Sequence, residues 1–289
     1  MAALPPHLLI FGLGYCGRAI AEAARDAGIA VSGTSRQPGF APPEGVALIP
    51  FAEADGAIAE ASHIVITAAP GEAGDPVLAR YGAALEAARG LRWIGFLSST
   101  GVYGDRGGDW VDEEAEPRPT SARARARRAA EEAWEALARR LGIPLDLIRL
   151  AGIYGPGRSA FDDLRAGRAR RILKPGHAFG RIHRGDIAQG TLAALHRPGS
   201  PAAARVLNFN DDLPAEPAEV VTEAARLLGV APPPFIPFAE AAAGMTAMGR
   251  SFWAESRRVS GARTQALLAR PWRFPTYREG LRAILAGEG

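Results

Sequence analysis

The stretch LLIFGLGYCGRAIAEAARDAGIAVSGTSR, residues 8–36, decides the fold of this chain. It begins with a short apolar run, which is long enough for one buried parallel strand. Three glycines follow with the spacing G-x-G-x-x-G; they are Gly12, Gly14 and Gly17. A run with helical periodicity comes next, and Gly28 lies where a glycine commonly ends a helix. With the apolar run after Gly28, the stretch predicts a strand, a loop, a helix and a second strand.

A glycine-rich loop between a strand and a helix is the usual setting for binding a dinucleotide. Gly12 permits the tight turn, Gly14 lets a pyrophosphate approach the backbone, and Gly17 allows close packing of the helix. The N–H groups and the positive dipole of the helix N-terminus attract phosphates. We therefore expect a dinucleotide at this loop, beside Tyr15 and Cys16; the alternative is a merely tight turn.

The end of the second predicted strand distinguishes the two nicotinamide dinucleotides. An NAD site usually has an acid about 20 residues after the loop, which binds the ribose 2′-hydroxyl. No acid occurs in residues 29–36, where Thr34, Ser35 and Arg36 offer hydroxyls and a guanidinium for a 2′-phosphate. The sequence thus predicts NADP(H) in preference to NAD(H). The alternative is that Arg36 stacks on adenine or faces solvent.

Composition limits the classes of function. The chain has 289 residues, 47% of them hydrophobic, which suffices for an α/β domain with a smaller lobe. The net charge is only +3, and no basic stripe interleaved with aromatic residues indicates a nucleic-acid surface. Cys16 is the single cysteine, which excludes an internal disulfide and favours the cytoplasm. No apolar run has membrane-spanning length and the histidines lack metal-binding spacing, so we expect neither membrane nor metal.

Apolar runs and helical segments alternate along the first half of the chain. The runs predicted as strands are residues 8–11, 29–32, 46–51, 63–67 and 93–98. This alternation predicts the α/β class, with a Rossmann-type doubly wound parallel sheet. Residues 1–155 form the predicted dinucleotide-binding core. In residues 156–289 the predicted helices and strands are shorter, which indicates a smaller, irregular α+β substrate lobe. Within this range, about residues 171–210 are predicted to return to the core.

Ligands of such a sheet bind outside the carboxyl ends of its strands. Small residues follow the fourth predicted strand; they are Ala68, Ala69 and Pro70. They would let a cofactor ribose lie close to the backbone, although an ordinary turn is the alternative. The fifth predicted strand runs into consecutive hydroxyl side chains, those of Ser98, Ser99 and Thr100, which indicates a site in preference to core.

Three segments carry a family resemblance. They are SSTGVYG at residues 98–104, RLAGIYGPGR at residues 149–158 and RIHRGDIA at residues 181–188. Together they resemble the extended short-chain dehydrogenase/reductases of the NAD-dependent epimerase/dehydratase group, in an atypical, YeeZ-like branch. The resemblance implies that Ser99 polarises the substrate oxygen, with Ser98 beside the cofactor and Thr100 beside the substrate.

The family's Tyr-x-x-x-Lys pair is missing. In the family the lysine lowers the tyrosine pKa and binds the nicotinamide ribose, and the tyrosine is the acid/base. Alignment on Glu131 places Arg123 at the tyrosine and Arg127 at the lysine, and Lys174 is the only lysine in the chain. We expect Arg127 to contact the cofactor in the catalytic site and Arg123 to bind an anionic substrate. The alternative is a solvated helix face laced with i,i+4 ion pairs.

Other side chains would then have to handle protons or substrate. Tyr103 and Tyr154 are the candidates for catalytic acid/base, although each could be a packing aromatic with a satisfied hydroxyl. His183 is a candidate for substrate binding, with a backbone-bonding role as the alternative. Arg158, after a Gly-Pro-Gly turn, is a candidate for a substrate anion.

These features predict an NADP(H)-binding protein of the short-chain dehydrogenase/reductase type. As an enzyme it would be an oxidoreductase or an epimerase/dehydratase acting on a small carbonyl or nucleotide-sugar-like substrate. The alternative is a non-catalytic NADP(H)-binding sensor, which the missing Tyr–Lys pair favours. We expect a monomer or a homodimer.

Overall fold

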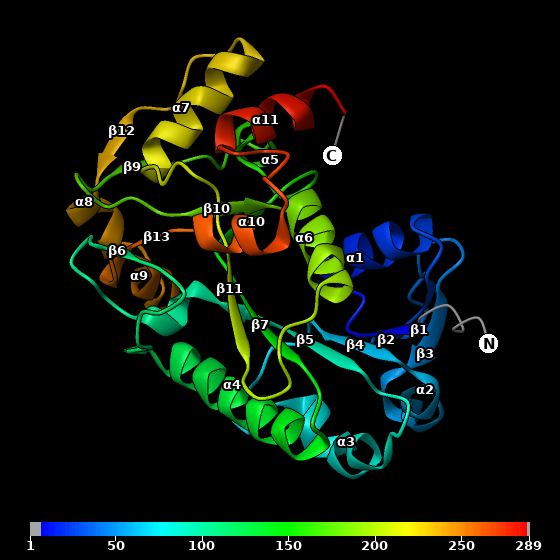
Figure 1. Ribbon diagram of the computed structural model, residues 1–289. Helices are drawn as coiled ribbons and strands as arrows, with labels where there is room; N and C mark the ends of the chain where they lie inside the picture. Colours follow the sequence, from blue (N-terminus) through cyan, green and yellow to red (C-terminus); the bar gives the residue numbers. More distant parts are fainter. Residues whose placement is uncertain (1–6, 288–289) are drawn as a thin grey trace. The chain divides into compact units, whose positions relative to one another are not determined.

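The computed structural model describes residues 7–287, which form two compact units (Figure 1). The first unit comprises residues up to 99, 122–149 and 187–207, and the second comprises residues 100–121, 150–186 and those from 208 onward. Residues 187–207 return to the first unit, whereas residues 171–186 belong to the second. Residues 100–121 group with the second unit, whereas the sequence analysis placed them in the first.

The first unit is built on a seven-stranded sheet with the order β11-β7-β5-β4-β1-β2-β3. Its strands are β1 (His7–Phe11), β2 (Ala30–Ser35), β3 (Ala47–Pro50), β4 (His63–Ile66), β5 (Trp93–Ser99), β7 (Leu145–Leu150) and β11 (Arg205–Phe209). Every pair from β3 to β5 is parallel. The strand order reverses between β1 and β4, which is the switch point where ligands bind such sheets.

Helices cover both faces of this sheet. Their bounds are α1 (Tyr15–Asp26), α2 (Asp55–Glu60), α3 (Pro76–Ala87), α4 (Ala122–Leu141) and α6 (Arg184–His196). Figure 1 shows α2, α3 and α4 on one face and α1 and α6 on the other. Strand side chains alternate between the faces, so Leu9 and Phe11 join the core under α2, α3 and α4, whereas Leu8 and Ile10 are buried on the side of α1.

A polar contact joins two helices on the α4 side of the sheet. One oxygen of Asp75 accepts the backbone N–H groups of Val77 (2.9 Å) and Leu78 (3.0 Å) and so caps the N-terminus of α3. Its other oxygen accepts the indole N–H of Trp134 in α4, at 3.1 Å. Both side chains are buried, so a single carboxylate satisfies the helix end and the tryptophan.

A buried ion pair connects α4 to β7 and β5. The side chains of Glu131 and Arg149 are 0% and 2% exposed, and Arg149 donates from Nε (3.0 Å) and Nη2 (2.8 Å) to the two carboxylate oxygens. The hydroxyl of Ser98, near the end of β5, donates to the same carboxylate at 2.6 Å, and Arg128 adds a contact at 3.1 Å. Glu131 therefore fixes α4 against the ends of two central strands. The i,i+4 spacing of Arg127 and Glu131 would allow an ion pair on the helix surface, but Glu131 is buried in these contacts instead.

The second unit consists of short elements. Its strands are β6 (Trp110–Val111), β8 (Gly152–Tyr154), β9 (Arg171–Leu173), β10 (Arg181–His183), β12 (Phe235–Pro237) and β13 (Arg258–Val259). Its helices are α5 (Ala160–Arg165), α7 (Pro217–Leu228), α8 (Phe238–Ala243), α9 (Ala247–Ala254), α10 (Ala262–Leu268) and α11 (Tyr277–Leu285). The strands form parallel pairs, β8 with β10, β9 with β12 and β6 with β13. A small core of Tyr154, Phe161, Tyr277 and Leu281 lies among β8, α5, α7 and α11.

Asp211 holds the start of β10. Its Oδ1 accepts the backbone N–H of Arg181 at 3.2 Å, and its own N–H donates to the carbonyl of Arg181. Its Oδ2 is buried and has no hydrogen-bond partner among the described residues. Burial raises the pKa of Asp211 to about 7, although the Arg181 N–H and guanidinium act in the opposite direction. The carboxyl is therefore partly protonated near neutral pH.

The predicted fold class is confirmed, because the sheet is a Rossmann-type parallel sheet and the second unit is an irregular mixture of helices and strands. The predicted strands and helices of the first half all occur, with small shifts at their ends. The short pairs β9–β12 and β6–β13 were not predicted. Within residues 7–287, none of the helices combines the length and apolar character needed to cross a membrane.

Replacement of Glu131 by alanine should strongly destabilise the first unit. It leaves Arg149 buried without its carboxylate, and breaking a buried pair in this way costs about 3–5 kcal/mol of unfolding free energy. Glu132→Ala is the matched control, because Glu132 makes a solvent-exposed pair with Arg128 on the same helix, worth less than about 0.5 kcal/mol. Urea unfolding of both variants checks this expectation. Equal small losses would show that the buried pair contributes no more than the exposed one.

Asp211 should make stability depend on pH. The carboxyl titrates near 3.8 in the unfolded chain and near 7 in the folded one, so between these values the folded protein holds a proton that the unfolded chain has lost. The unfolding free energy therefore falls as pH rises from about 4 to about 7, and this contribution is constant above that range.

Asp211→Asn keeps an oxygen for the Arg181 N–H and removes the titration. The variant should gain stability relative to the wild type as pH is raised from about 5 to about 8, measured by urea unfolding at each pH. Asp109→Asn, at an exposed position of the second unit that does not act on the pKa of Asp211, is the control and should track the wild type. An unchanged difference between Asp211→Asn and wild type across this range would contradict the raised pKa.

Candidate functional site

The glycine loop lies between β1 and α1, and its backbone explains each glycine. Gly12 has φ of +106°, a conformation that favours glycine. A Cβ on Gly17 would lie 2.0 Å from the carbonyl oxygen of Gly12, so α1 can approach β1 this closely only without a side chain. A Cβ on Gly14 would meet no atom within 4 Å, so the space in front of this residue is open. This arrangement fits a pyrophosphate at the N-terminus of α1.

A threonine that the sequence analysis overlooked braces this loop from the next strand. Thr67 follows β4, and its hydroxyl donates to the carbonyls of Gly12 (2.5 Å) and Phe11 (3.2 Å). The backbone N–H of Ala68 also donates to the Phe11 carbonyl, at 3.1 Å. These bonds bring the segment of Ala68, Ala69 and Pro70 beside the glycine loop, as its predicted contact with the cofactor requires. The sequence signal that could have identified Thr67 is a hydroxyl residue at the end of a strand next to the switch point.

At the end of β2, the three residues that were predicted to hold a 2′-phosphate have different environments. Thr34 is 1% exposed; its hydroxyl accepts the Gly12 N–H at 3.2 Å, and its carbonyl accepts the Leu13 N–H. Thr34 therefore shapes the loop, which differs from the predicted contact with ligand. The Ser35 hydroxyl accepts the N–H of Gln37 at 3.1 Å. Arg36 is exposed, and its guanidinium has no hydrogen bond or ion pair with any residue in the described range 7–287.

Arginine side chains also hold the loop that follows Arg36. Arg18 in α1 donates to the carbonyl of Ala41 at 2.7 Å and lies over the ring of Phe40, 5.2 Å from its centroid. About two turns further along, Arg25 donates to the carbonyl of Glu44 at 2.6 Å. This loop therefore packs along α1, and Arg36 lies where the loop leaves β2.

The guanidinium of Arg127 lies near the end of β5, and its predicted contact with the cofactor stays a prediction. Its Nη1 donates to the carbonyl of Leu97 at 2.8 Å, and its side chain is buried against the ring of Phe96. Burial, and next the charge of Arg123, lower the pKa of Arg127 to about 10. The group therefore stays cationic at neutral pH and suits an electrostatic or hydrogen-bonding role. Arg123, at the position of the family's tyrosine, is exposed.

The serines at the end of β5 have different environments. The Ser98 hydroxyl is buried and donates to Glu131, so it serves the ion pair, whereas the sequence analysis placed it at the cofactor. Ser99 is half-buried at the last position of the strand. Thr100 is the first residue of the second unit, and its side chain is buried. The predicted contact of Ser99 with the substrate stays a prediction.

The two candidate tyrosines are buried. The Tyr103 hydroxyl donates to Oδ1 of Asn208 at 2.8 Å. Tyr154 lies against α11, where a Cβ on Gly280 would come within 2.0 Å of its hydroxyl oxygen. Burial, and next the charge of Asp211, raise the pKa of Tyr154 well above its usual value, so its phenolate is disfavoured. Both tyrosines thus match the packing alternative and differ from the predicted acid/base role.

His183 is buried beside Tyr154 and is neutral. Its Nδ1 accepts the backbone N–H of Gly185 at 3.1 Å, which is the backbone-bonding alternative to the predicted substrate contact. Its ring meets those of Tyr154 and Phe274 at centroid distances of 5.2 and 4.2 Å. Burial, and next the charge of Arg184, lower the pKa of His183 to about 4. The His183 ring is therefore uncharged at neutral pH and offers no positive charge to a substrate anion.

A cavity of about 370 Å³ lies wholly within the second unit. The cavity is lined by residues from β8, β10, α5, α7 and α11. Arg158, the candidate for a substrate anion, is one of the lining residues. Other lining residues are Tyr154, Arg181, Val220, Tyr277 and Leu281. Arg181 was not singled out for a site from the sequence, because an arginine in a three-residue strand carries no signal of its own.

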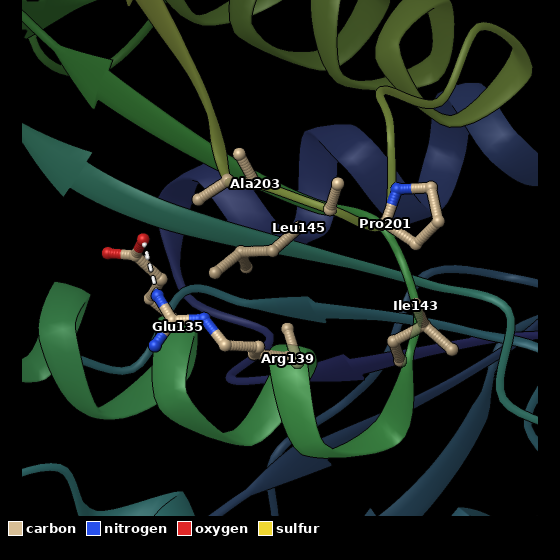
Figure 2. A pocket seen from close by; sticks show the side chains of 9 residues that line it. Glu135, Arg139, Ile143, Leu145, Pro201 and Ala203 are labelled. Atoms are coloured by element: carbon tan, nitrogen blue, oxygen red, sulfur yellow. Dashed lines mark hydrogen bonds and ion pairs between the residues drawn. The ribbon is translucent and has the colours of Figure 1, made fainter.

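A second hollow, beside α4, is too small for a ligand. Figure 2 shows Glu135 and Arg139 of α4 on one side and Pro201 and Ala203 on the other. Its volume is about 10 Å³, which is no more than about one water molecule needs. Among the described residues, no group of three or more His, Cys, Asp or Glu side chains is arranged to hold a metal ion.

Known proteins resemble this chain in sequence and in architecture. Protein YeeZ of Escherichia coli K12 is 34% identical over 145 residues, which are 48% of this chain and 47% of that protein. The match thus spans about half the length of that curated relative. A solved structure of a functionally unknown conserved protein from Silicibacter pomeroyi DSS is 41% identical, with a TM-score of 0.87 over 98% of this chain and 99% of that one.

More distant structures share the fold. A UDP-glucuronic acid 4-epimerase from Bacillus cereus, solved in complex with NAD, is 17% identical, with a TM-score of 0.73 over 97% of this chain and 96% of that one. The model of the NAD dependent epimerase/dehydratase family matches residues 8–208, from the first strand to the last strand of the sheet. Because this match covers more than half of the sequence, the chain belongs to the NAD-dependent epimerase/dehydratase family.

Proposed function

We propose that this protein binds NADP(H) through its first unit and acts as an oxidoreductase or an epimerase/dehydratase. The observation that carries the NADP(H) preference is the exposed guanidinium of Arg36 at the end of β2, without an ion-pair partner in the described range and without an acid in residues 29–36. A 2′-phosphate is a dianion that such a guanidinium can bind with two parallel hydrogen bonds. NAD(H), which lacks that phosphate, would leave Arg36 in solvent.

The rest of the predicted cofactor site supports this proposal. The open space before Gly14 and the close packing at Gly17 suit a pyrophosphate on the N-terminus of α1. When bound, the nicotinamide would supply the hydride donor or acceptor. Ser99 would donate a hydrogen bond to the substrate oxygen, and Arg127 would provide a fixed positive charge at the end of β5.

The substrate class that we propose is a small carbonyl compound or a nucleotide-sugar-like compound. Family membership supports it. Two solved structures of the same fold are a UDP-glucuronic acid 4-epimerase and a UDP-glucose 4-epimerase, each in complex with NAD. A cytoplasmic location and a monomeric or homodimeric state stay predictions.

A sensor that binds NADP(H) without turning it over is the second candidate function. It is favoured by the side chains that replace the family's acid/base pair, because Arg123 is exposed and Arg127 stays protonated at neutral pH. The hydroxyls of Tyr103 and Tyr154 are buried in packing contacts. Tight NADPH binding with no consumption of NADPH or reduction of NADP+ across panels of carbonyl compounds and nucleotide sugars would support the sensor.

Arg36→Ala should weaken NADPH binding by about ten- to a hundredfold and leave NADH binding nearly unchanged. The loss corresponds to the hydrogen bonds that a charged group makes to the 2′-phosphate. Titration of the intrinsic fluorescence of NADPH and NADH checks this. The control is Arg92→Ala, another exposed arginine, which precedes β5 and therefore lies at the amino end of its strand, whereas Arg36 lies at the carboxyl end of β2. Equal losses for both cofactors would remove the NADP(H) preference.

Ser99→Ala should leave the dissociation constant of NADPH within about twofold and reduce kcat/KM by at least about a hundredfold for any substrate that the protein turns over. The hydroxyl would bind the substrate oxygen as charge develops on it, and the loss of one such donor typically has this effect. Steady-state rates followed at the NADPH absorbance, together with cofactor titration, separate the two effects. A rate equal to that of the wild type would exclude Ser99 from the reaction.

A further inference from the structure

The cavity of the second unit is lined by both apolar and charged side chains. The residues that line it include the apolar Val220 of α7 and Leu281 of α11 and the aromatic Tyr154 and Tyr277. Arginines contribute the charge, and Arg181 is the one that belongs to a strand, β10. A cavity with apolar walls and a few placed polar groups is typical of a small-molecule site.

The guanidinium of Arg181 is oriented by the protein. Its Nη1 donates to the carbonyls of Phe179 (2.9 Å) and Ala215 (3.0 Å), and it lies over the ring of Tyr277, 5.9 Å from the centroid. Its Nε and Nη2 have no hydrogen-bond partner among residues 7–287. Two fixed bonds and a ring therefore set the direction of the group and leave further donors for a ligand.

The acidic side chains of the lining are already engaged. Asp162 accepts the N–H and the hydroxyl of Ser159, both at 2.7 Å, as the capping box of α5. Asp163 pairs with Arg168 at 3.4 Å. Asp211 contacts the backbone of Arg181 and is not part of the lining. These acids therefore do not pair with Arg181, and Arg158 contributes a second guanidinium to the lining.

We propose that this cavity binds a compact organic anion, a carboxylate or phosphate ester on a single small ring or short chain, with Arg181 as its anion partner. The planar fork of an arginine matches both oxyanions. The apolar side chains of Val220 and Leu281 cover the body of the ligand. The volume of about 370 Å³ is near the lower end of the range of about 300–1,000 Å³ for ligand sites, which suits a compact ligand. The site does not depend on NADP(H) binding by the first unit.

Calorimetric titration of the full chain with benzoate, phenyl phosphate and UDP-glucose tests the proposal. Saturable binding of benzoate, of phenyl phosphate or of both is expected, and the stronger of the two identifies the oxyanion. Arg181→Gln should weaken this binding more than tenfold, because it removes the charged donor. Arg170→Gln is the matched control, since Arg170 is an exposed arginine outside the lining, and its affinity should equal that of the wild type.

A second variant guards against a folding defect, because Arg181 also holds two carbonyls. Val220→Trp fills the cavity without touching the arginine and should abolish binding of the small anions. Its affinity for NADPH and its melting temperature should stay near those of the wild type. The proposal is overturned if neither small anion binds, if their binding survives both variants, or if UDP-glucose binds with the same dependence on Arg181 and Val220. Loss of NADPH binding in Arg36→Ala would test the other proposal and has no bearing on this one.

Discussion

The first unit depends on a charge that lies wholly out of water, the carboxylate of Glu131. Transfer of such an ion into the protein costs several kcal/mol, so it persists only where partners replace its hydration. The fork of Arg149 satisfies both oxygens, and Ser98 and Arg128 contribute further hydrogen bonds. These partners come from β7, β5 and α4 itself. The rotation of α4 about its axis is thereby fixed, and one turn earlier the same rotation presents Arg127 to the carbonyl of Leu97.

In the glycine loop, too, side chains hold the backbone in a fixed position. Two threonine hydroxyls, those of Thr34 and Thr67, are directed at the backbone of Gly12. They keep the loop in place between β1, β2 and β4 while the space before Gly14 stays open. The side chains nearest the predicted pyrophosphate thus hold the loop, and the backbone is left to meet the ligand. In the proposed NADP(H) preference, the specificity for one dinucleotide would rest on Arg36, which is exposed at the end of β2.

The sequence allowed the fold of the first unit to be predicted because its signals are local. Strand hydrophobicity, glycine spacing and helical periodicity each require only neighbouring residues, and Gly12, Gly14 and Gly17 behave as expected. Thr34 and Ser98 were predicted at the cofactor but serve the protein's own hydrogen bonds. Their partners are 22 and 33 residues away in sequence, so no pattern in the chain reveals that the hydroxyls are already used.

The second unit was harder to predict for a related reason. Strands such as β9 and β12 have three residues each and pair with segments more than sixty positions apart, so they lack periodicity. The direction of the Arg181 side chain follows from the carbonyls of Phe179 and Ala215, which are brought together only by folding. The sequence did indicate Arg158, because a Gly-Pro-Gly turn precedes it.

The replacement of the family's Tyr–Lys pair separates binding from proton transfer. Arg127 keeps the positive charge of the lysine, but with a pKa of about 10 it is almost wholly protonated at pH 7 and exchanges no proton there. Tyr154 cannot take over, because its phenolate is disfavoured by burial and its hydroxyl is packed against Gly280. His183 is neutral and its Nδ1 is committed to the backbone. Arg127, Tyr154 and His183 are thus poorly suited to proton transfer at neutral pH, whereas binding of an anionic cofactor requires only the positive charge that arginines supply.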